Sequence, residues 1–176
     1  MKIGIVSDTH YNNTFLTKVV KFFKEEESVV KVYHLGDEWD DLKVLDDEGI
    51  DYKAVPGIFA EQYKDESIAN QIVDEVNGVK VLLTHDLSDL YVDGKPTELI
   101  KDNDVILFGH THSYELKYSL GKLFLNPGHL KEEYHKDRVA TFAVMSINAT
   151  GDINAKIYDI NFNYIAEISR SLSVIL

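Results

Sequence analysis

The sequence of 176 residues contains no cysteine. Disulfide bonds, zinc–thiolate sites and cysteine nucleophiles are therefore excluded, so any metal ion has to be held by nitrogen and oxygen ligands. The sequence also lacks an apolar run long enough to span a bilayer, and its first residues enter a strand pattern without the architecture of a signal peptide. We therefore expect no membrane partner and a cytoplasmic location.

Positive charge is scarce. Lysine and arginine number 18 against 30 aspartates and glutamates, which gives a formal net charge of −12. An acidic surface repels phosphate backbones, so we expect no broad binding to nucleic acids. A small phosphorylated substrate is not excluded, because bound metal ions would bring their own positive charge. The sequence leaves open whether the chain forms a homo-oligomer.

Two catalytic motifs are also missing. There is no Gly-rich loop ending in Gly-Lys-Ser/Thr, which argues against phosphate transfer by a Walker-type loop, and no G-x-S-x-G elbow for a serine nucleophile. Hydrophobic residues make up 44% and charged residues 27%, values typical of a globular protein. Because the prolines are isolated and no linker divides the chain, we predict a single domain over residues 1–176.

The first part of the chain alternates between strand and helix patterns. Residues 2–7, 30–35 and 52–55 have the composition of strands. Residues 13–24 carry the apolar spacing of a helix that buries one face, and residues 40–47 predict a shorter helix. Short strands that are joined by helices favour parallel pairing.

After residue 55 the pattern changes, and from residue 115 onward it favours antiparallel strands. Residues 71–76 and 79–84 flank Asn77-Gly78, a strong signal for a hairpin. A short helix over 96–101 and a strand over 105–108 follow, and then strands over 115–119, 123–125, 141–147 and 153–159, with a further strand in 161–168. The pattern predicts an α/β fold in which two mixed sheets pack as a two-layer sandwich flanked by helices.

Aspartates and histidines follow the predicted strands, at the ends where open α/β sheets place their functional sites. An aspartate can bridge two metal ions with its two oxygens, and two histidines one residue apart can serve two ions from one loop. Imidazole and carboxylate ligands suit manganese, iron, nickel or zinc. A single histidine at a strand end is more often structural, but together these residues predict a metal centre: Asp8 and His10, Asp37 after Gly36, His85, and His110 with His112.

Three further histidines have weaker settings. His34 lies inside a predicted strand, so we expect it to pack there or to support a metal ligand through a hydrogen bond. His135 lies in the charged stretch 131–138 and is predicted to be a solvated loop residue. For His129, which follows Asn126-Pro127-Gly128, a surface loop position and a catalytic role remain equally open.

These motifs resemble those of the calcineurin-like metallophosphoesterases. The resemblance rests on Asp8-x-His10, Gly36-Asp37-x-x-Asp40, His85 and Gly109-His110-Thr111-His112, and it runs from residue 1 to about residue 160. The short chain and the Asn-Pro-Gly motif resemble the compact prokaryotic phosphodiesterase branch, which shares its fold with the retromer scaffold subunit. The resemblance implies two divalent transition metal ions (Mn, Ni, Fe or Zn). It assigns Asp8, His10, Asp37 and His112 to the first ion, and Asp37, as the bridge, with His85 and His110 to the second.

The resemblance breaks in the segment after the third strand. The family's metal-binding asparagine is replaced by Ile58, and the general-acid histidine of larger members is replaced by Phe59. The second ion is therefore expected to bind more weakly, with Glu61 or water filling the gap.

The resemblance implies a phosphodiesterase in which a hydroxide that bridges two metal ions attacks phosphorus. The expected catalytic residues are Asp37, as the bridging ligand, and His129, which supplies the proton unless the substrate has a good leaving group. The alternative is a catalytically weak or inactive metal-binding scaffold that uses the same fold for protein–protein contacts.

Overall fold

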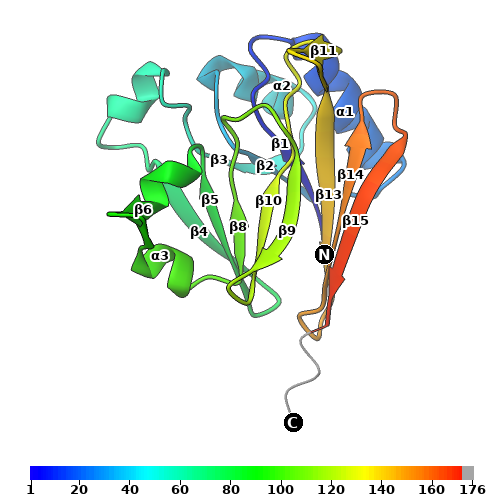
Figure 1. The fold of residues 1–176 in the computed structure, drawn as a ribbon. Helices are drawn as coiled ribbons and strands as arrows, with labels where there is room; N and C mark the ends of the chain where they lie inside the picture. Colours follow the sequence, from blue (N-terminus) through cyan, green and yellow to red (C-terminus); the bar gives the residue numbers. More distant parts are fainter. Residues whose placement is uncertain (172–176) are drawn as a thin grey trace.

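The computed structural model describes residues 1–171, so the last five positions of the predicted 1–176 domain lie outside the described residues. Within residues 1–171, a six-stranded and a five-stranded sheet pack against each other around a shared apolar core, and helices cover their outer faces (Figure 1). This arrangement confirms the predicted α/β sandwich with flanking helices.

The six-stranded sheet has the order β15-β14-β13-β1-β2-β3. Strands β1, β2 and β3 form one half of the sheet and are parallel, as predicted, whereas β13, β14 and β15 add to it in antiparallel fashion. The bounds are β1 (Lys2–Val6), β2 (Lys31–His34), β3 (Asp51–Ala54), β13 (Thr141–Ile147), β14 (Ile153–Asp159) and β15 (Tyr164–Arg170).

The last strand begins three residues later than the predicted 161–168. The Asp159 carboxylate accepts hydrogen bonds from the backbone N–H groups of Asn161 and Asn163, at 2.8 and 2.9 Å, and so closes a turn at these positions. The alternation of apolar residues at 162–168 is therefore shared between a turn and a strand.

The five-stranded sheet has the order β4-β5-β8-β10-β9, with β5, β8 and β10 parallel. The predicted hairpin joins β4 to β5, and both residues of its turn, Asn77 and Gly78, have positive φ angles, at 51° and 78°. The bounds are β4 (Gln71–Val76), β5 (Val79–Thr84), β8 (Val105–Leu107), β9 (Glu115–Ser119) and β10 (Lys122–Asn126).

Helices on the outer faces build two further apolar clusters. Helix α1 (Asn13–Glu25) starts at Asn12, whose side chain accepts a hydrogen bond from the backbone of Phe15. Together with the 3-10 turn η1 (Trp39–Asp41) and α2 (Leu42–Asp47) it covers the six-stranded sheet. The 3-10 turn η3 (Leu87–Leu90) and α3 (Glu98–Lys101) cover the five-stranded sheet. None of the helices in residues 1–171 is long and apolar enough to cross a membrane.

Several short elements were not predicted. They are the 3-10 turns η2 (Glu61–Lys64) and η3, the hairpin of β6 (Tyr91–Val92) and β7 (Lys95–Pro96), and the hairpin of β11 (Tyr134–His135) and β12 (Arg138–Val139). The β11–β12 hairpin lies at the upper end of the molecule in Figure 1, where β1, β2, β5 and β8 also end. The loops that carry the candidate site residues therefore gather at this end.

One polar cluster joins the two sheets. Asp74 of β4 accepts a hydrogen bond of 2.7 Å from the Tyr33 hydroxyl of β2 and lies 3.2 and 2.8 Å from the ammonium groups of Lys31 and Lys53. Burial raises the pKa of Asp74, but the contacts with Lys53, Tyr33 and Lys31 outweigh it and lower the pKa to about 2. A charged Asp74 therefore stabilises the packing of β4 on the other sheet.

Candidate metal centre

Backbone hydrogen bonds tie the predicted loops to one another. The Asp8 N–H donates to the Gly36 carbonyl at 3.0 Å, and the Gly109 N–H donates to the His85 carbonyl at 2.9 Å. The His110 N–H donates to the Asp8 carboxylate, also at 2.9 Å. The loops after β1, β2, β5 and β8 consequently meet at one place, although they come from two different sheets.

The backbone of this place is unusual. Five of the candidate ligands have positive φ angles: Asp8 (52°), His10 (46°), Asp37 (111°), His110 (68°) and His112 (57°). Non-glycine residues rarely adopt this region, and such conformations persist where the surrounding structure imposes them, often at functional sites. The conformation turns these side chains toward one another at the strand ends.

The four residues predicted for the first ion lie in contact. His10 places Nδ1 2.7 Å from Asp37 Oδ2 and Nε2 3.0 Å from His112 Nε2. His112 Nε2 also lies 3.3 Å from Asp8 Oδ1. Two imidazole nitrogens that face each other need a shared proton or cation between them. The donor atoms of Asp8, His10 and His112 all lie within 4.8 Å of one another, so this set fits a metal ion.

A second group of donors comprises Asp8, Asp37 and His85. His85 Nδ1 lies 2.7 Å from the Leu35 carbonyl. A carbonyl oxygen only accepts, so Nδ1 carries the proton and the lone pair of Nε2 is free for a metal ion. This is the hydrogen bond by which proteins commonly fix the tautomer of a metal-binding histidine.

His110 is placed differently from the other candidates. Its Nε2 lies 3.9 Å from a carboxylate oxygen of Asp86, and its ring stands 5.3 Å from the ring of His85. Among residues 1–171, His110 belongs to none of the compact donor groups. The predicted second set, Asp37, His85 and His110, is therefore gathered only in part. Asp86 was not among the predicted residues, although it directly follows His85.

Two glycines allow the close approach of the loops. A Cβ atom at Gly36 would lie 2.7 Å from Nδ1 of His85, and the φ angle of Gly36 is +93°, so a sharp turn and a close approach coincide. A Cβ atom at Gly109 would lie only 2.0 Å from the Ser7 hydroxyl oxygen, whose proton is donated to the Asp8 carboxylate at 2.6 Å.

Two supporting residues matter more than the sequence indicated. Asp41 is fully buried and accepts hydrogen bonds from the Thr9 hydroxyl and, at 3.2 Å, from the Tyr11 N–H, so it holds both sides of His10. The family resemblance had included Asp40, which is exposed. The direction of turn η1 decides which of these two adjacent carboxylates points inward, and no local sequence pattern shows that direction.

Asn126 is the second supporting residue. It is fully buried at the end of β10, and its side-chain amide donates to the Gly109 carbonyl at 2.8 Å and to the Thr111 hydroxyl at 3.1 Å. Its amide oxygen accepts from the Gly128 N–H at 2.9 Å. The asparagine of the Asn-Pro-Gly motif therefore holds the loop that carries His110 and His112.

The remaining histidines surround the centre. His34 is buried, accepts a hydrogen bond of 3.2 Å from the Gly36 N–H, and has a pKa that burial lowers to about 4, so the prediction that it packs within the strand is confirmed. The His135 side chain is only 15% exposed, with its ring 5.1 Å from that of His112 and its Nδ1 2.7 Å from the Glu132 carboxylate. The prediction of a solvated loop residue was wrong, because the β11–β12 hairpin places this ring against His112.

His129 is 0% exposed, so the surface-loop alternative was wrong. Its ring lies 5.6 Å from that of His112, its Nε2 lies 3.2 Å from the Arg138 carbonyl, and burial lowers its pKa. The role of His129 as a proton donor stays a prediction.

The charges of the centre suit a cation. Burial raises the pKa of Asp8, but the hydrogen bonds with His112 and from Ser7 act against it, and the pKa lies below its ordinary value. The hydrogen bond with Asp37 raises the pKa of His10, which shows the negative field at that ring. An ionised carboxylate and a negative field both favour a bound metal ion.

The segment after β3 packs closely on this centre. A Cβ atom at Gly57 would lie 2.6 Å from Cα of Asp37, so only glycine fits there. The following residue, Ile58, is half-buried and offers no donor atom, and Phe59 is 86% exposed. This segment therefore supplies packing to the centre but no ligand at the two positions where the resemblance breaks.

The chain is similar to known proteins in both sequence and structure. The sequence matches the model of the calcineurin-like phosphoesterase superfamily domain over residues 1–150. A comparison with curated proteins found no significant match.

Several solved structures share the fold. A single mutant of Vps29 from Entamoeba histolytica matches with a TM-score of 0.73 and 19% identity, over 97% of this chain and 100% of that one. Wild-type Vps29 from the same organism, in complex with Zn²⁺, matches with a TM-score of 0.68 and 21% identity, over 96% of this chain and 99% of that one. YfcE, a phosphoesterase from E. coli, matches with a TM-score of 0.70 and 15% identity, over 96% of this chain and 99% of that one. An archaeal phosphodiesterase matches with a TM-score of 0.66 and 23% identity, over 97% of this chain and 100% of that one.

Proposed function

Because the chain belongs to the calcineurin-like phosphoesterase superfamily, we propose that it is a metal-dependent phosphodiesterase that acts on a small substrate through a two-metal centre. Membership supports a hydrolase of phosphoesters in general. The observation that carries the finer proposal is the convergence of His10, His112 and two carboxylates, with imidazole nitrogens facing each other at 3.0 Å.

In this proposal, the first ion is held by Asp8, His10, Asp37 and His112. The second is held by Asp37 and His85, with His110 on the adjacent loop. Imidazole and carboxylate donors of this kind suit Mn²⁺, Fe²⁺, Ni²⁺ or Zn²⁺. When bound, the ions would supply positive charge for the phosphoryl oxygens and for the attacking water molecule.

The residues of the chain prepare the site for this charge. Hydrogen bonds from the Ser7 hydroxyl and the His110 N–H orient the Asp8 carboxylate. The contact with the Leu35 carbonyl fixes the tautomer of His85. We keep His129 as the proposed proton donor, although its burial means that a leaving group reaches it only if the neighbouring rings of His112 and His135 move.

The test uses protein that has been stripped of metal and then supplied with Mn²⁺ or Ni²⁺, with bis(p-nitrophenyl) phosphate as substrate. We expect turnover that depends on added metal and falls at least about 100-fold in Asp37→Ala, because that carboxylate belongs to both ion sites. His85→Asn serves as a second variant in case Asp37→Ala fails to fold, and Glu75→Gln, an exposed change on β4, is the control. Turnover that needs no metal, or that survives in both variants, would refute the proposal.

A metal-binding scaffold is the second candidate function. It is favoured by Ile58, which offers no donor where the family uses asparagine, and by the turn of His110 toward Asp86. The fold similarity to Vps29 is compatible with it. Metal analysis of the purified protein together with the turnover assay separates the two: about two ions per chain with turnover favour the enzyme, whereas bound metal without turnover favours the metal-binding scaffold.

A further inference from the structure

A cavity of about 290 Å³ borders the candidate metal centre. We call it the aromatic–acidic pocket, because three aromatic and three acidic side chains line it together with Ala60 and Gln62: Tyr11, Trp39 and Phe59, and Glu38, Asp40 and Glu61. It adjoins the centre directly, since Tyr11 follows His10 in the chain and Glu38 follows Asp37. Glu38 also forms a third compact donor group with His10 and Asp37, whose donor atoms all lie within 4.8 Å of one another.

Two of the aromatic rings are not needed for packing. Phe59 is 86% and Tyr11 is 64% exposed, so their rings add little to any apolar core. Trp39, by contrast, packs partly against the core under α1 and α2 and forms the fixed wall of the pocket. The face of an aromatic ring carries negative charge density, and it attracts an organic cation that comes within about 6 Å.

The charged residues of the pocket have one sign. Its lining includes three carboxylates and no lysine, arginine or histidine. The Tyr11 phenol and the Glu38 carboxylate line the pocket together. Such a lining repels a second phosphate or a carboxylate and attracts a positive group.

We propose that the substrate of the phosphodiesterase carries a quaternary ammonium group of the choline type, which occupies the aromatic–acidic pocket while the phosphate lies at the metal centre. The substrate assignment rests on the function proposed above. At about 290 Å³, the pocket lies at the small end of the range of ligand sites, roughly 300–1,000 Å³, and this size suits a head group rather than a nucleotide.

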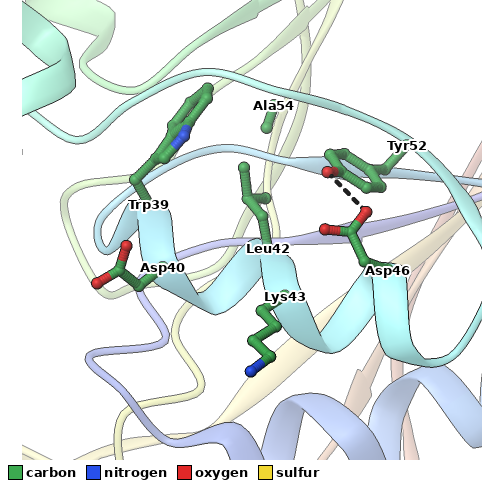
Figure 2. A pocket seen from close by; sticks show the side chains of 7 residues that line it. All are labelled: Trp39, Asp40, Leu42, Lys43, Asp46, Tyr52 and Ala54. Atoms are coloured by element: carbon green, nitrogen blue, oxygen red, sulfur yellow. Dashed lines mark hydrogen bonds between the residues drawn. The ribbon is translucent and has the colours of Figure 1, made fainter.

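A larger cavity of about 530 Å³ does not support the same inference. It lies over α2 and β3, and Trp39 and Asp40 line it as well (Figure 2). Its lining includes Lys43, and its Asp46 carboxylate accepts a hydrogen bond of 3.1 Å from the Tyr52 hydroxyl. It also contains none of the candidate ligands. A change at Tyr52 therefore provides a control for the neighbouring pocket.

Ligand binding can be measured without metal or turnover, because Trp39 is the only tryptophan of the chain. Metal-free protein is titrated with choline chloride, with sodium chloride at the same ionic strength, and with 3,3-dimethylbutanol, which has carbon in place of the choline nitrogen. We expect choline chloride to change the tryptophan fluorescence in a saturable way, and sodium chloride and 3,3-dimethylbutanol not to do so. An equal response to the uncharged analogue, or no saturable response to choline, would overturn the proposal.

Variants assign the response to this pocket. Phe59→Leu removes one exposed ring without disturbing the core and is expected to weaken choline binding roughly 5- to 30-fold, the range of a cation–π contact. Phe59→Tyr keeps the ring and should bind as the wild type does, and Glu61→Gln should weaken binding. Glu75→Gln, which removes a distant charge, and Tyr52→Phe, which alters the other cavity, should change nothing. Equal loss in these controls would contradict the assignment.

Turnover tests the substrate class itself. In p-nitrophenyl phosphocholine and p-nitrophenyl 3,3-dimethylbutyl phosphate, water adds to phosphorus and p-nitrophenolate leaves, and the two esters differ only in the charge of the head group. We expect kcat/KM to be roughly 10- to 30-fold higher for the choline ester, and the ratio to fall toward one in Phe59→Leu and to return in Phe59→Tyr. A wild-type ratio of one or below refutes the substrate assignment. If neither ester is hydrolysed, the proposed enzymatic function fails, and choline binding alone then decides the ligand of the pocket.

Discussion

Asp41 is the buried carboxylate that holds the loop of Asp8 and His10, although it is not a candidate ligand itself. In Asp41→Ala, the Thr9 hydroxyl and the Tyr11 N–H lose their acceptor. A buried donor without a partner costs about 1–3 kcal/mol; the Tyr11 N–H is only partly buried, so the variant should lose roughly 2–4 kcal/mol of unfolding free energy in all. Both bonds end on the same carboxylate oxygen, so Asp41→Asn keeps an acceptor for them and should lose about half as much.

The same change should weaken the first metal site. The φ angles of Asp8 and His10 are positive, at 52° and 46°, and need support from the surrounding structure. Residues that support metal ligands typically change the affinity about 10- to 100-fold when they are replaced. We therefore expect Asp41→Asn to remain folded and to bind Mn²⁺ or Zn²⁺ at least about 10-fold more weakly.

Urea unfolding measures the first effect and calorimetric metal titration the second. With a slope of about 2 kcal/mol per molar urea, the Asp41→Ala midpoint should fall by roughly 1–2 M. Asp40→Ala is the matched control, because it removes the same group from the adjacent exposed position and should change the free energy by less than about 0.5 kcal/mol. If Asp40→Ala and Asp41→Ala behave alike, or if Asp41→Asn binds metal as the wild type does, the reasoning is refuted.

Three further changes test other parts of the structure. Gly109→Ala should weaken metal binding at least about 10-fold, because its Cβ would lie 2.0 Å from the Ser7 hydroxyl oxygen. Adding Ser7→Ala should restore part of the affinity, and calorimetry that shows no loss, or no recovery, would speak against a steric cause. The contribution of Asp74 to stability is present above its ordinary pKa of 3.8 and disappears as the pH falls toward 2. The urea midpoint of Asp74→Asn should therefore differ from that of the wild type more at pH 5 than at pH 3, and an equal difference at the two pH values would contradict the lowered pKa. Mn²⁺ at 100 times its dissociation constant should stabilise the protein by about 2.7 kcal/mol, which raises Tm by roughly 5–10 °C. Excess chelator should reverse this shift in a thermal melt, and an unchanged Tm would mean that the folded chain binds no metal.

The sequence predicted most of the fold because the signals of the main strands are local. The Asn77-Gly78 turn fixed the hairpin of β4 and β5, and the predicted strands 141–147 and 153–159 coincide with β13 and β14. The start of β15 was missed because Asp159 closes a turn through side-chain hydrogen bonds. The hairpins β6–β7 and β11–β12 have strands of only two residues, too short for any periodic pattern to appear.

The candidate site was predicted where spacing determines geometry. Asp8, His10 and His112 follow strands that end at the same place, and the structure brings them together. Side-chain direction is a tertiary property, so the contact of His110 with Asp86 had no local signal. The position of His135 against His112 depends likewise on a hairpin that the sequence did not reveal.

The central claim is that this chain hydrolyses phosphodiesters at a centre of two metal ions. The most direct measurement adds Mn²⁺ stepwise to metal-free protein, with the protein well above the dissociation constants, while the initial rate of bis(p-nitrophenyl) phosphate hydrolysis is followed. The account predicts little turnover after the first equivalent, which fills the site of Asp8, His10, Asp37 and His112, and a rise as the second binds near His85. Two equivalents bound without turnover above that of free Mn²⁺, or full turnover before any metal is added, would contradict it.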